Sequence, residues 1–109
     1  MTIHIEDLKF KTIIGILDFE RVTPQDVIVN LTLEYNYENE FINYADVASL
    51  IKADFKKSRF LLLEDALTTI SLNLKKEFSK MNTLNLKITK PSILPDCKVS
   101  VSNQYKFNS

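Results

Sequence analysis

The sequence has little of what metal, disulfide and nucleotide chemistry require: among 109 residues there are one cysteine, one histidine and one glycine. The single cysteine, Cys97, cannot form a disulfide within the chain, which is typical of a reducing cytoplasm. A catalytic zinc takes about three protein ligands, mostly His or Cys, and only His4 and Cys97 are of these types. We therefore expect no zinc site and no bound cofactor. A magnesium ion held by carboxylates stays open, although one glycine cannot build a phosphate-binding glycine loop.

Excess charge and long apolar runs are also absent. Fourteen Lys and Arg residues balance fourteen Asp and Glu residues, and no basic block stands out, which argues against nucleic acid as a partner. No window approaches the roughly 20 apolar residues of a membrane span, and the charged first residues lack the apolar core of a signal peptide. We expect a cytoplasmic protein without a membrane partner, in which residues 1–109 form one domain.

Alternation of apolar and polar residues predicts four strands. In the first strand the apolar residues fall out of step by one position, which predicts a β-bulge near Glu6-Asp7. His4 should lie on the outer face of this strand, and Cys97 should pack as a small apolar residue at the start of the last one. The connection from Gly15 to Gln25 is expected to be a loop. The four strands are predicted over residues 3–14, 27–37, 84–90 and 99–107.

Two further segments carry apolar residues at helical spacing. The first begins after Asn43, which can cap it, and runs to about Phe55, where the polar residues 56–59 break it. The second covers residues 63–78. The order strand, strand, helix, helix, strand, strand predicts an α+β fold, in which two helices cover one face of a four-stranded antiparallel sheet. Both edges of such a sheet are exposed in a monomer, so a symmetric oligomer is expected.

Two polar residues at element ends are candidates for a site. Lys90 ends an alternating run and is followed by Pro91, which cannot continue the strand. A lysine in this position can project into a cleft, although such a residue is most often a solvated charge. Glu64 lies in the first turn of the second helix, where it can complement the helix dipole. It can also be a partly buried carboxylate that binds the paired N–H donors of a heterocycle.

Two other polar residues have equally open interpretations. Glu20 lies in the connection between the first two strands, where a solvated acid, paired with Arg21, is the simpler interpretation. Tyr44 follows Asn43 at a helix start, and it can pack its ring and expose its hydroxyl. The functional alternatives are a site carboxylate for Glu20 and a proton-transferring phenol for Tyr44.

Together these segments resemble the dihydroneopterin aldolase family of folate biosynthesis. The resemblance covers nearly the full chain in the family's order, and the sequence departs from the family's pattern at Ile13-Ile14, Pro24 and Asp96. These departures bear on loop conformation and turnover rate more than on the type of reaction. The similar pieces are Gly15-Ile16-Leu17 with Glu20 and Gln25, the segment from Ile42 to Val47, Leu62-Leu63-Glu64, and Lys87 to Pro91 running on to Pro95.

The resemblance implies a tunnelling fold (T-fold) that assembles into a homo-oligomeric barrel, a tetramer or an octamer, with pterin sites between neighbouring subunits. It implies Lys90 as the principal acid/base, Glu20 as its partner, and Tyr44 as a proton donor from the adjacent subunit. The substrate-binding residues implied in the same way are Glu64 for the pterin's amino group and ring N–H, Leu63 and Leu17 for backbone contacts, and Ile42 on the neighbour's side of the pocket.

The implied reaction is a retro-aldol cleavage of 7,8-dihydroneopterin, and it suits a chain with so few metal ligands. The C6=N5 imine of the substrate can accept the electrons of the breaking bond, so neither a metal nor a lysine Schiff base is needed. Lys90 would act as a base if neutral, or polarise N5 if cationic, and the sequence leaves both open. The alternatives are an epimerase of dihydroneopterin or its triphosphate, and a non-catalytic pterin- or purine-binding module. Zinc-dependent T-fold enzymes are disfavoured because His4 is the only histidine.

Overall fold

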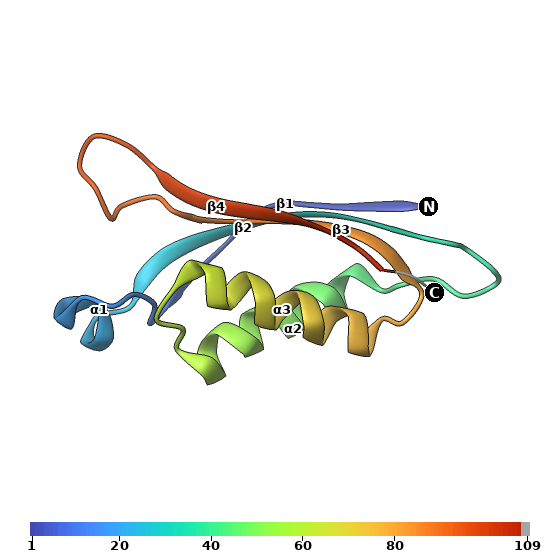
Figure 1. Ribbon diagram of the computed structural model, residues 1–109, viewed down its shortest axis with the longest axis horizontal. Helices are drawn as coiled ribbons and strands as arrows, with labels where there is room; N and C mark the ends of the chain where they lie inside the picture. The colour runs from blue at the N-terminus through green and yellow to red at the C-terminus, as the bar shows by residue number, and fades with distance from the viewer. Residues whose placement is uncertain (108–109) are drawn as a thin grey trace.

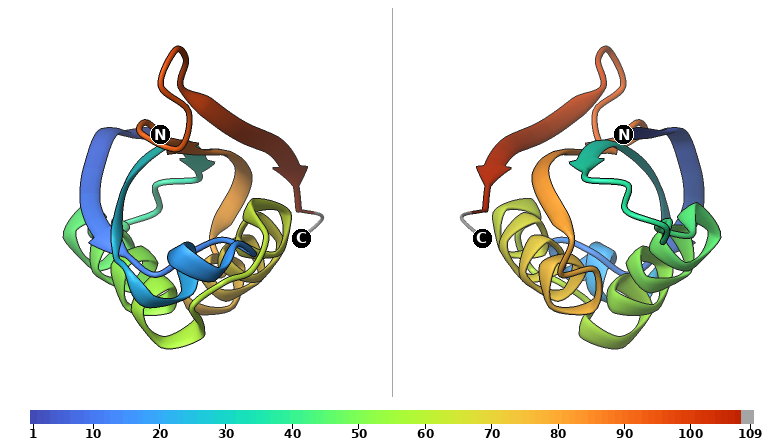
Figure 2. Two further views of the ribbon diagram at one scale, coloured as in Figure 1. Left: turned by 90° about the vertical axis from the view of Figure 1, so that its left-hand side faces the viewer. Right: turned by 90° about the vertical axis from the view of Figure 1, so that its right-hand side faces the viewer.

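The computed structural model describes residues 1–107. Four strands form one sheet in the order β1-β2-β3-β4, with every neighbouring pair antiparallel. Two long helices lie side by side on one face of this sheet, as the views from its two ends show (Figures 1 and 2). The predicted α+β fold class is confirmed. In chain order the elements are β1 (Thr2–Thr12), α1 (Asp18–Val22), β2 (Gln25–Tyr35), α2 (Tyr44–Ser58), α3 (Leu63–Glu77), β3 (Met81–Lys90) and β4 (Val99–Lys106).

The core lies between the sheet and the two long helices. Alternate residues of β2, from Val27 to Tyr35, are buried, and they meet buried residues of β3, α2 and α3. Phe55 of α2 is fully buried, and its ring packs edge-on against Phe10 and Phe60 with centroids 5.3 and 5.5 Å away. Each buried side chain of this size contributes about 1.5–3 kcal/mol. The packing therefore fixes the position of the helices over the sheet.

The first strand contains the predicted bulge. Its register against β2 shifts between Ile5 and Leu8, and Asp7 adopts a left-handed backbone with φ of 57°. The Asp7 N–H donates to the side chain of Asn30 at 2.8 Å, so the irregular residue keeps a hydrogen bond. His4 is exposed, and its Nδ1 lies 3.3 Å from the Thr32 hydroxyl, which confirms the predicted outer face.

Several boundaries differ from the sequence prediction. The predicted loop from Gly15 to Gln25 contains the short helix α1, and the second strand ends at Tyr35, so that Tyr37 is exposed. Helix α2 continues through the polar residues 56–58 and ends at Ser58, with Arg59 as its C-cap. Lysine and serine tolerate a solvated last helical turn, so polarity alone did not mark its end.

A further correction concerns Cys97. Cys97 is exposed in the β3–β4 connection, two positions before β4, and does not pack as an apolar residue. The connection projects away from the helices at the end of the molecule that also carries α1 (Figure 1). Strands β1 and β4 each pair on one side only. Within residues 1–107 no helix is long and apolar enough to cross a membrane.

Candidate functional site

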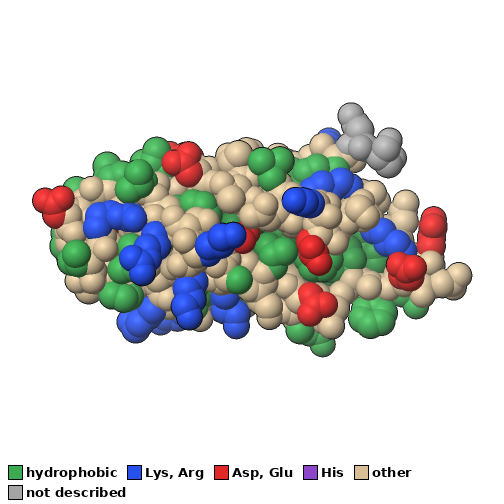
Figure 3. Space-filling view, turned by 90° about the horizontal axis from the view of Figure 1, so that it is seen from below, with side chains coloured by type: hydrophobic (Ala, Val, Ile, Leu, Met, Phe, Trp, Pro, Cys, Tyr) green, Lys and Arg blue, Asp and Glu red, His purple; other side chains and the backbone are tan. Residues whose placement is uncertain are grey.

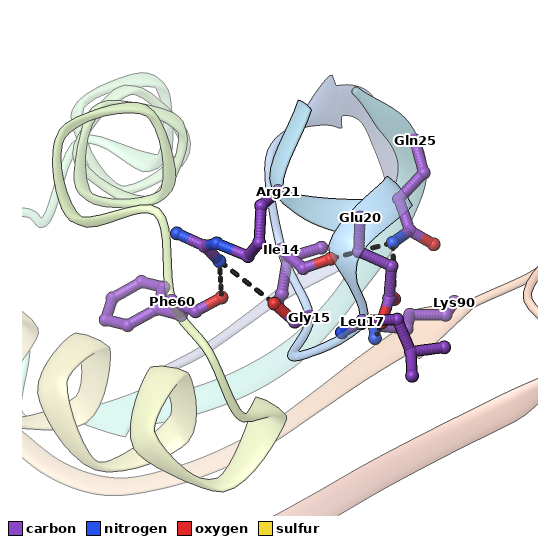
Figure 4. A network of polar contacts seen from close by, with 8 residues as sticks. All are labelled: Ile14, Gly15, Leu17, Glu20, Arg21, Gln25, Phe60 and Lys90. Atoms are coloured by element: carbon purple, nitrogen blue, oxygen red, sulfur yellow. Dashed lines mark hydrogen bonds and ion pairs between the residues drawn. The ribbon is translucent and has the colours of Figure 1, made fainter. Parts of the chain in front are cut away.

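The candidate site lies at the end of the sheet where the β1–β2 connection meets the end of β3. The Lys90 ammonium contacts the Glu20 carboxylate, with 2.8 Å between Nζ and Oε2 (Figure 4). The two side chains are only 12% and 3% exposed. Because 70 residues separate them in the sequence, the fold alone brings this amine and this acid together.

Glu20 has a full set of hydrogen-bond partners. Gln25 Nε2 donates to Glu20 Oε2 at 2.9 Å and to the Ile14 carbonyl at 2.8 Å. The Leu17 N–H donates to Glu20 Oε1 at 3.2 Å. A buried carboxylate is stable only with such partners. The interpretation of Glu20 as a solvated loop acid is therefore wrong.

These contacts also explain the short helix α1. The carboxylate of Glu20 reaches back to the Leu17 N–H at the helix start, while the Glu20 N–H donates to the Leu17 carbonyl at 2.9 Å. Acidic side chains in a first turn also complement the helix dipole. A helix of five residues is not stable by itself, so the contacts of Glu20 help to hold it in place.

Gly15, the only glycine of the chain, makes room for this carboxylate. Its φ of +122° is a conformation that other residues rarely adopt, and a Cβ at this position would overlap the carboxyl group of Glu20. The Gly15 N–H donates to the Phe60 carbonyl at 3.0 Å. Gly15 thus lets the β1–β2 connection pass closely over Glu20.

Arg21 fastens this connection to the segment between α2 and α3. Its Nη1 donates to the carbonyls of Gly15 at 3.0 Å and Phe60 at 3.2 Å, and its Nη2 donates to the Arg59 carbonyl at 2.8 Å. The expected pairing of Arg21 with Glu20 is therefore wrong. The guanidinium donates to three carbonyl groups, and the Glu20 carboxylate pairs with Lys90 instead.

The electrostatics of the pair favour its charged form. Burial by itself would raise the pKa of the Glu20 carboxyl, but the hydrogen bonds from Lys90, Gln25 and the Leu17 N–H, together with the positive charge of Lys90, hold it below its ordinary value of 4.5. Glu20 is therefore a carboxylate at neutral pH. The buried carboxylate holds the Lys90 side chain at the end of β3 through the 2.8 Å contact.

Glu64 lies in the first turn of α3, as predicted, but its side chain is exposed and not partly buried. The carbonyl of Glu64 accepts from the Thr68 hydroxyl at 3.2 Å. Leu63 is buried, and Leu62 precedes it without a side-chain cap for the helix. The first N–H groups of α3 and the Glu64 carboxylate thus offer donors and an acceptor to a ligand.

The remaining predicted residues divide between the two ends of the molecule. Leu17 is half exposed beside Glu20, whereas Tyr44 starts α2, which begins in the half of the molecule away from α1 (Figure 1). Tyr44 is 67% exposed and Ile42 is buried in the core of its own chain. One chain therefore does not bring Tyr44 to Lys90, and its role as a donor from an adjacent subunit stays a prediction. Between residues 1 and 107 no three His, Cys, Asp or Glu side chains gather as a metal site would need.

Gln25, Arg21 and Gly15 support the site. Gly15 and Gln25 belong to the segments that carry the family resemblance, but neither was predicted to contact Glu20. For Gly15 a signal existed, because an only glycine in a connection between strands indicates a backbone that no other residue can adopt. For Gln25 the resemblance was the signal, although it gave the residue no role, and no pattern predicted that Arg21 would bind carbonyls. Their partners are set by the fold.

The model of the dihydroneopterin aldolase family matches residues 3–104 of the chain. Among named relatives, the dihydroneopterin triphosphate 2′-epimerase of Pseudomonas aeruginosa is 31% identical over 100 residues, which cover 84% of this chain and 80% of the relative. The family match thus spans the β1–β2 connection, both long helices and β3.

Two solved structures share the fold. A Vibrio cholerae protein assigned as a dihydroneopterin aldolase superposes with a TM-score of 0.89 at 22% identity and covers 98% of both chains. The Escherichia coli dihydroneopterin aldolase, solved in complex with neopterin, gives a TM-score of 0.85 at 21% identity over 96% of this chain and 98% of the other. These likenesses confirm the predicted T-fold of the subunit.

Proposed function

The chain belongs to the dihydroneopterin aldolase family, and we propose that it cleaves 7,8-dihydroneopterin by a retro-aldol reaction to 6-hydroxymethyl-7,8-dihydropterin and glycolaldehyde. The observation that carries this proposal is the buried Glu20–Lys90 pair, which holds a charged amine at 12% exposure at the rim of the sheet. A retro-aldol reaction on this substrate needs such a cation where negative charge develops.

The proposed reaction proceeds in two proton-coupled steps. In the first, the C2′ hydroxyl loses its proton, the C1′–C2′ bond breaks, and the bond's electrons pass through C6 to N5, which takes up a proton. Glycolaldehyde and a pterin enamine result. In the second, C1′ of the enamine takes up a proton while N5 loses one, which restores the C6=N5 bond and gives the hydroxymethyl product. The substrate's own imine therefore accepts the electrons.

Lys90 is the group that we assign to N5. An ammonium has three N–H donors, and one of them is used by Glu20 at 2.8 Å, so two remain for the substrate and an ordered water. The lowered pKa of Glu20 makes it a weak base, and its proposed role is to hold the Lys90 side chain in place. The organised water then takes the proton of the C2′ hydroxyl.

The pterin ring would bind at the start of α3. The two oxygens of the Glu64 carboxylate match the amino group and ring N–H of a pterin, and the exposed carboxylate has both oxygens available. The backbone of Leu63 and Leu17 would contact the ring. Tyr44 would protonate C1′ from an adjacent subunit, which requires a homo-oligomer, a tetramer or octamer, with Ile42 near the shared boundary.

Epimerisation at C2′ is the second candidate, and the 31% identity to a dihydroneopterin triphosphate 2′-epimerase favours it. Both reactions begin with the same cleavage of the C1′–C2′ bond. An epimerase keeps the carbonyl fragment bound and re-forms the bond to its other face, whereas an aldolase protonates C1′ and releases it. How long the fragment stays bound decides between the two.

The test is to incubate the protein with 7,8-dihydroneopterin and with its triphosphate. An aldolase releases an aldehyde in amounts equal to the hydroxymethyl product: glycolaldehyde from 7,8-dihydroneopterin, and its phosphorylated form from the triphosphate. An epimerase instead produces the 2′ epimer, seen by chiral chromatography of the recovered substrate, with little free aldehyde. If neither product forms while neopterin binds, the chain is a pterin-binding module and the proposed catalysis is wrong.

A further inference from the structure

A basic pocket lies near the candidate site. It has a volume of about 380 Å³ and opens between the end of β1, Pro24 and the C-terminal half of α2. On the helix side of the molecule, basic side chains gather over the half that includes this region, while most acidic ones lie over the other half (Figure 3). The charged side chains that line the pocket are Lys11, Lys52, Lys56 and Arg59.

Three of these cations have no acidic partner among residues 1–107. Lys11 lies 3.2 Å from Asp26, but no carboxylate of residues 1–107 comes within 4.0 Å of Lys52, Lys56 or Arg59. Lys52 and Lys56 are four positions apart on α2, so their charges are neighbours and repel each other. In a chain whose net charge is zero, this is a local concentration of positive charge around a cavity.

The electrostatics of the helix end do not explain all four cations that line the pocket. Cations in a last turn complement the helix dipole, and this explains Lys56 and the neighbouring Lys57. Lys52 lies before the last turn, and the dipole effect falls off within that turn. Arg59 has a φ of 45° at the helix end, where glycine or asparagine is the usual choice. An arginine in this strained position indicates a use for its side chain.

We propose that this pocket binds an oligophosphate chain. Several phosphates in a row carry negative charges spaced along a flexible chain, which suits cations on two elements and a helix end. The pocket also borders the candidate site. Its lining residue Ile13 is two positions from Gly15, at most about 7 Å along the chain, and Gly15 lies against the Glu20 carboxyl.

Two sources can supply such a chain. One is the triphosphate of a phosphorylated dihydroneopterin, and this source rests on the proposed function. The other is a free oligophosphate that binds independently of any reaction. Both share the same recognition chemistry, so the binding test uses tripolyphosphate alone and needs no catalytic activity.

The experiment titrates the full-length protein with sodium tripolyphosphate by isothermal calorimetry at constant ionic strength. The variants are Lys52→Gln, Lys56→Gln and Arg59→Gly, singly and together. Glycine fits the left-handed backbone at position 59, so that variant should fold at least as well as the wild type. Lys57→Gln is the matched control, because Lys57 shares the last turn of α2 but does not line the pocket.

Each single change should weaken tripolyphosphate binding about fivefold, the triple change should abolish it, and Lys57→Gln should leave it within twofold of the wild type. Absent binding to the wild type, or equal binding to the triple variant, would overturn the proposal. If the triple variant also raises KM for dihydroneopterin triphosphate but not for dihydroneopterin, the source is the substrate. If KM is unchanged for both while tripolyphosphate binding is lost, the source is a free anion.

Discussion

Glu20 and Glu64 lie at the same end of the molecule, at the starts of α1 and α3, yet their surroundings are opposite (Figure 1). Glu20 is 2% exposed and receives hydrogen bonds from Lys90, Gln25 and the Leu17 N–H. Glu64 is exposed, and no described residue donates to its carboxylate or forms an ion pair with it. The two acids therefore cannot have the same task.

The two acids of this site therefore have different roles. A carboxylate whose partners all come from its own chain fixes the geometry and charge of a neighbour, here Lys90. A carboxylate at a helix start with no partner can exchange water for a ligand at little cost. We therefore expect changes near Glu20 to alter stability and turnover, and changes at Glu64 to alter binding.

The largest effect is expected from Lys90→Met. This change keeps the length of the side chain but removes the cation, and kcat should fall about a thousandfold because proton delivery to N5 is lost. Product formation is measured at saturating 7,8-dihydroneopterin. Lys87→Met is the control, since Lys87 lies on the same strand with its side chain exposed, and it should keep near wild-type turnover. Similar losses in both variants would separate Lys90 from the chemistry.

The double variant Glu20→Gln/Lys90→Met tests whether Glu20 and Lys90 depend on each other, by its free energy of unfolding. Lys90→Met alone leaves the Glu20 carboxylate buried without its cation and should lower the free energy of unfolding by about 3 kcal/mol. The double change removes the unpaired charge, so at least half of this loss should be recovered while turnover stays lost. Urea unfolding measures both variants. A double variant less stable than Lys90→Met would show that the pair is not coupled as described.

Gly15→Ala tests the space around Glu20. The new Cβ would overlap the Glu20 carboxyl, and alanine rarely adopts the backbone φ of +122° at this position. The free energy of unfolding should therefore fall by about 2–3 kcal/mol. Thr23→Ala, at an exposed position of the same connection, should change it by less than about 0.5 kcal/mol. Equal melting temperatures for the wild type and Gly15→Ala would contradict this close contact.

A smaller loss of folding stability is expected at acidic pH. Because the pKa of Glu20 is held below 4.5 in the folded protein, its carboxylate stabilises the fold fully above that pH. The contribution is lost as the pH falls through the lowered pKa. Between about pH 4.5 and the lowered value, the wild type should lose up to about 1.4 kcal/mol per pH unit more than Glu20→Gln. Parallel stability curves for the two proteins in this window would contradict the lowered pKa.

The sequence predicted the scaffold well because the scaffold depends on local periodicity. Alternation gave the four strands and the out-of-step residues gave the bulge at Asp7. Helical spacing gave α2 and α3, with Asn43 accepting from the Ala45 N–H at 2.9 Å as the predicted cap. Burial of one face imposes these patterns on neighbouring residues, so they can be read without the fold.

The contacts within the site could not be read in the same way. Glu20 and Lys90 are 70 residues apart, and no periodicity links them. The burial of Glu20 depends on the approach of Gly15 and on Arg21 binding the carbonyls of the α2–α3 connection. Glu64 was expected to be partly buried from its apolar neighbours, but a side chain in a first helical turn can point outward while those neighbours pack.

The most direct test of the division between the two acids is the affinity for neopterin, measured by fluorescence titration of Glu64→Gln and Lys90→Met beside the wild type. Losing a charged hydrogen-bond acceptor costs about 1.5–3 kcal/mol, so Glu64→Gln should bind neopterin at least about tenfold more weakly. The neopterin affinity of Lys90→Met should stay within about threefold of the wild type, although its turnover of dihydroneopterin is lost. Equal losses of affinity in the two variants, or unchanged binding by Glu64→Gln, would contradict the assignment of pterin binding to Glu64 and of turnover to Lys90.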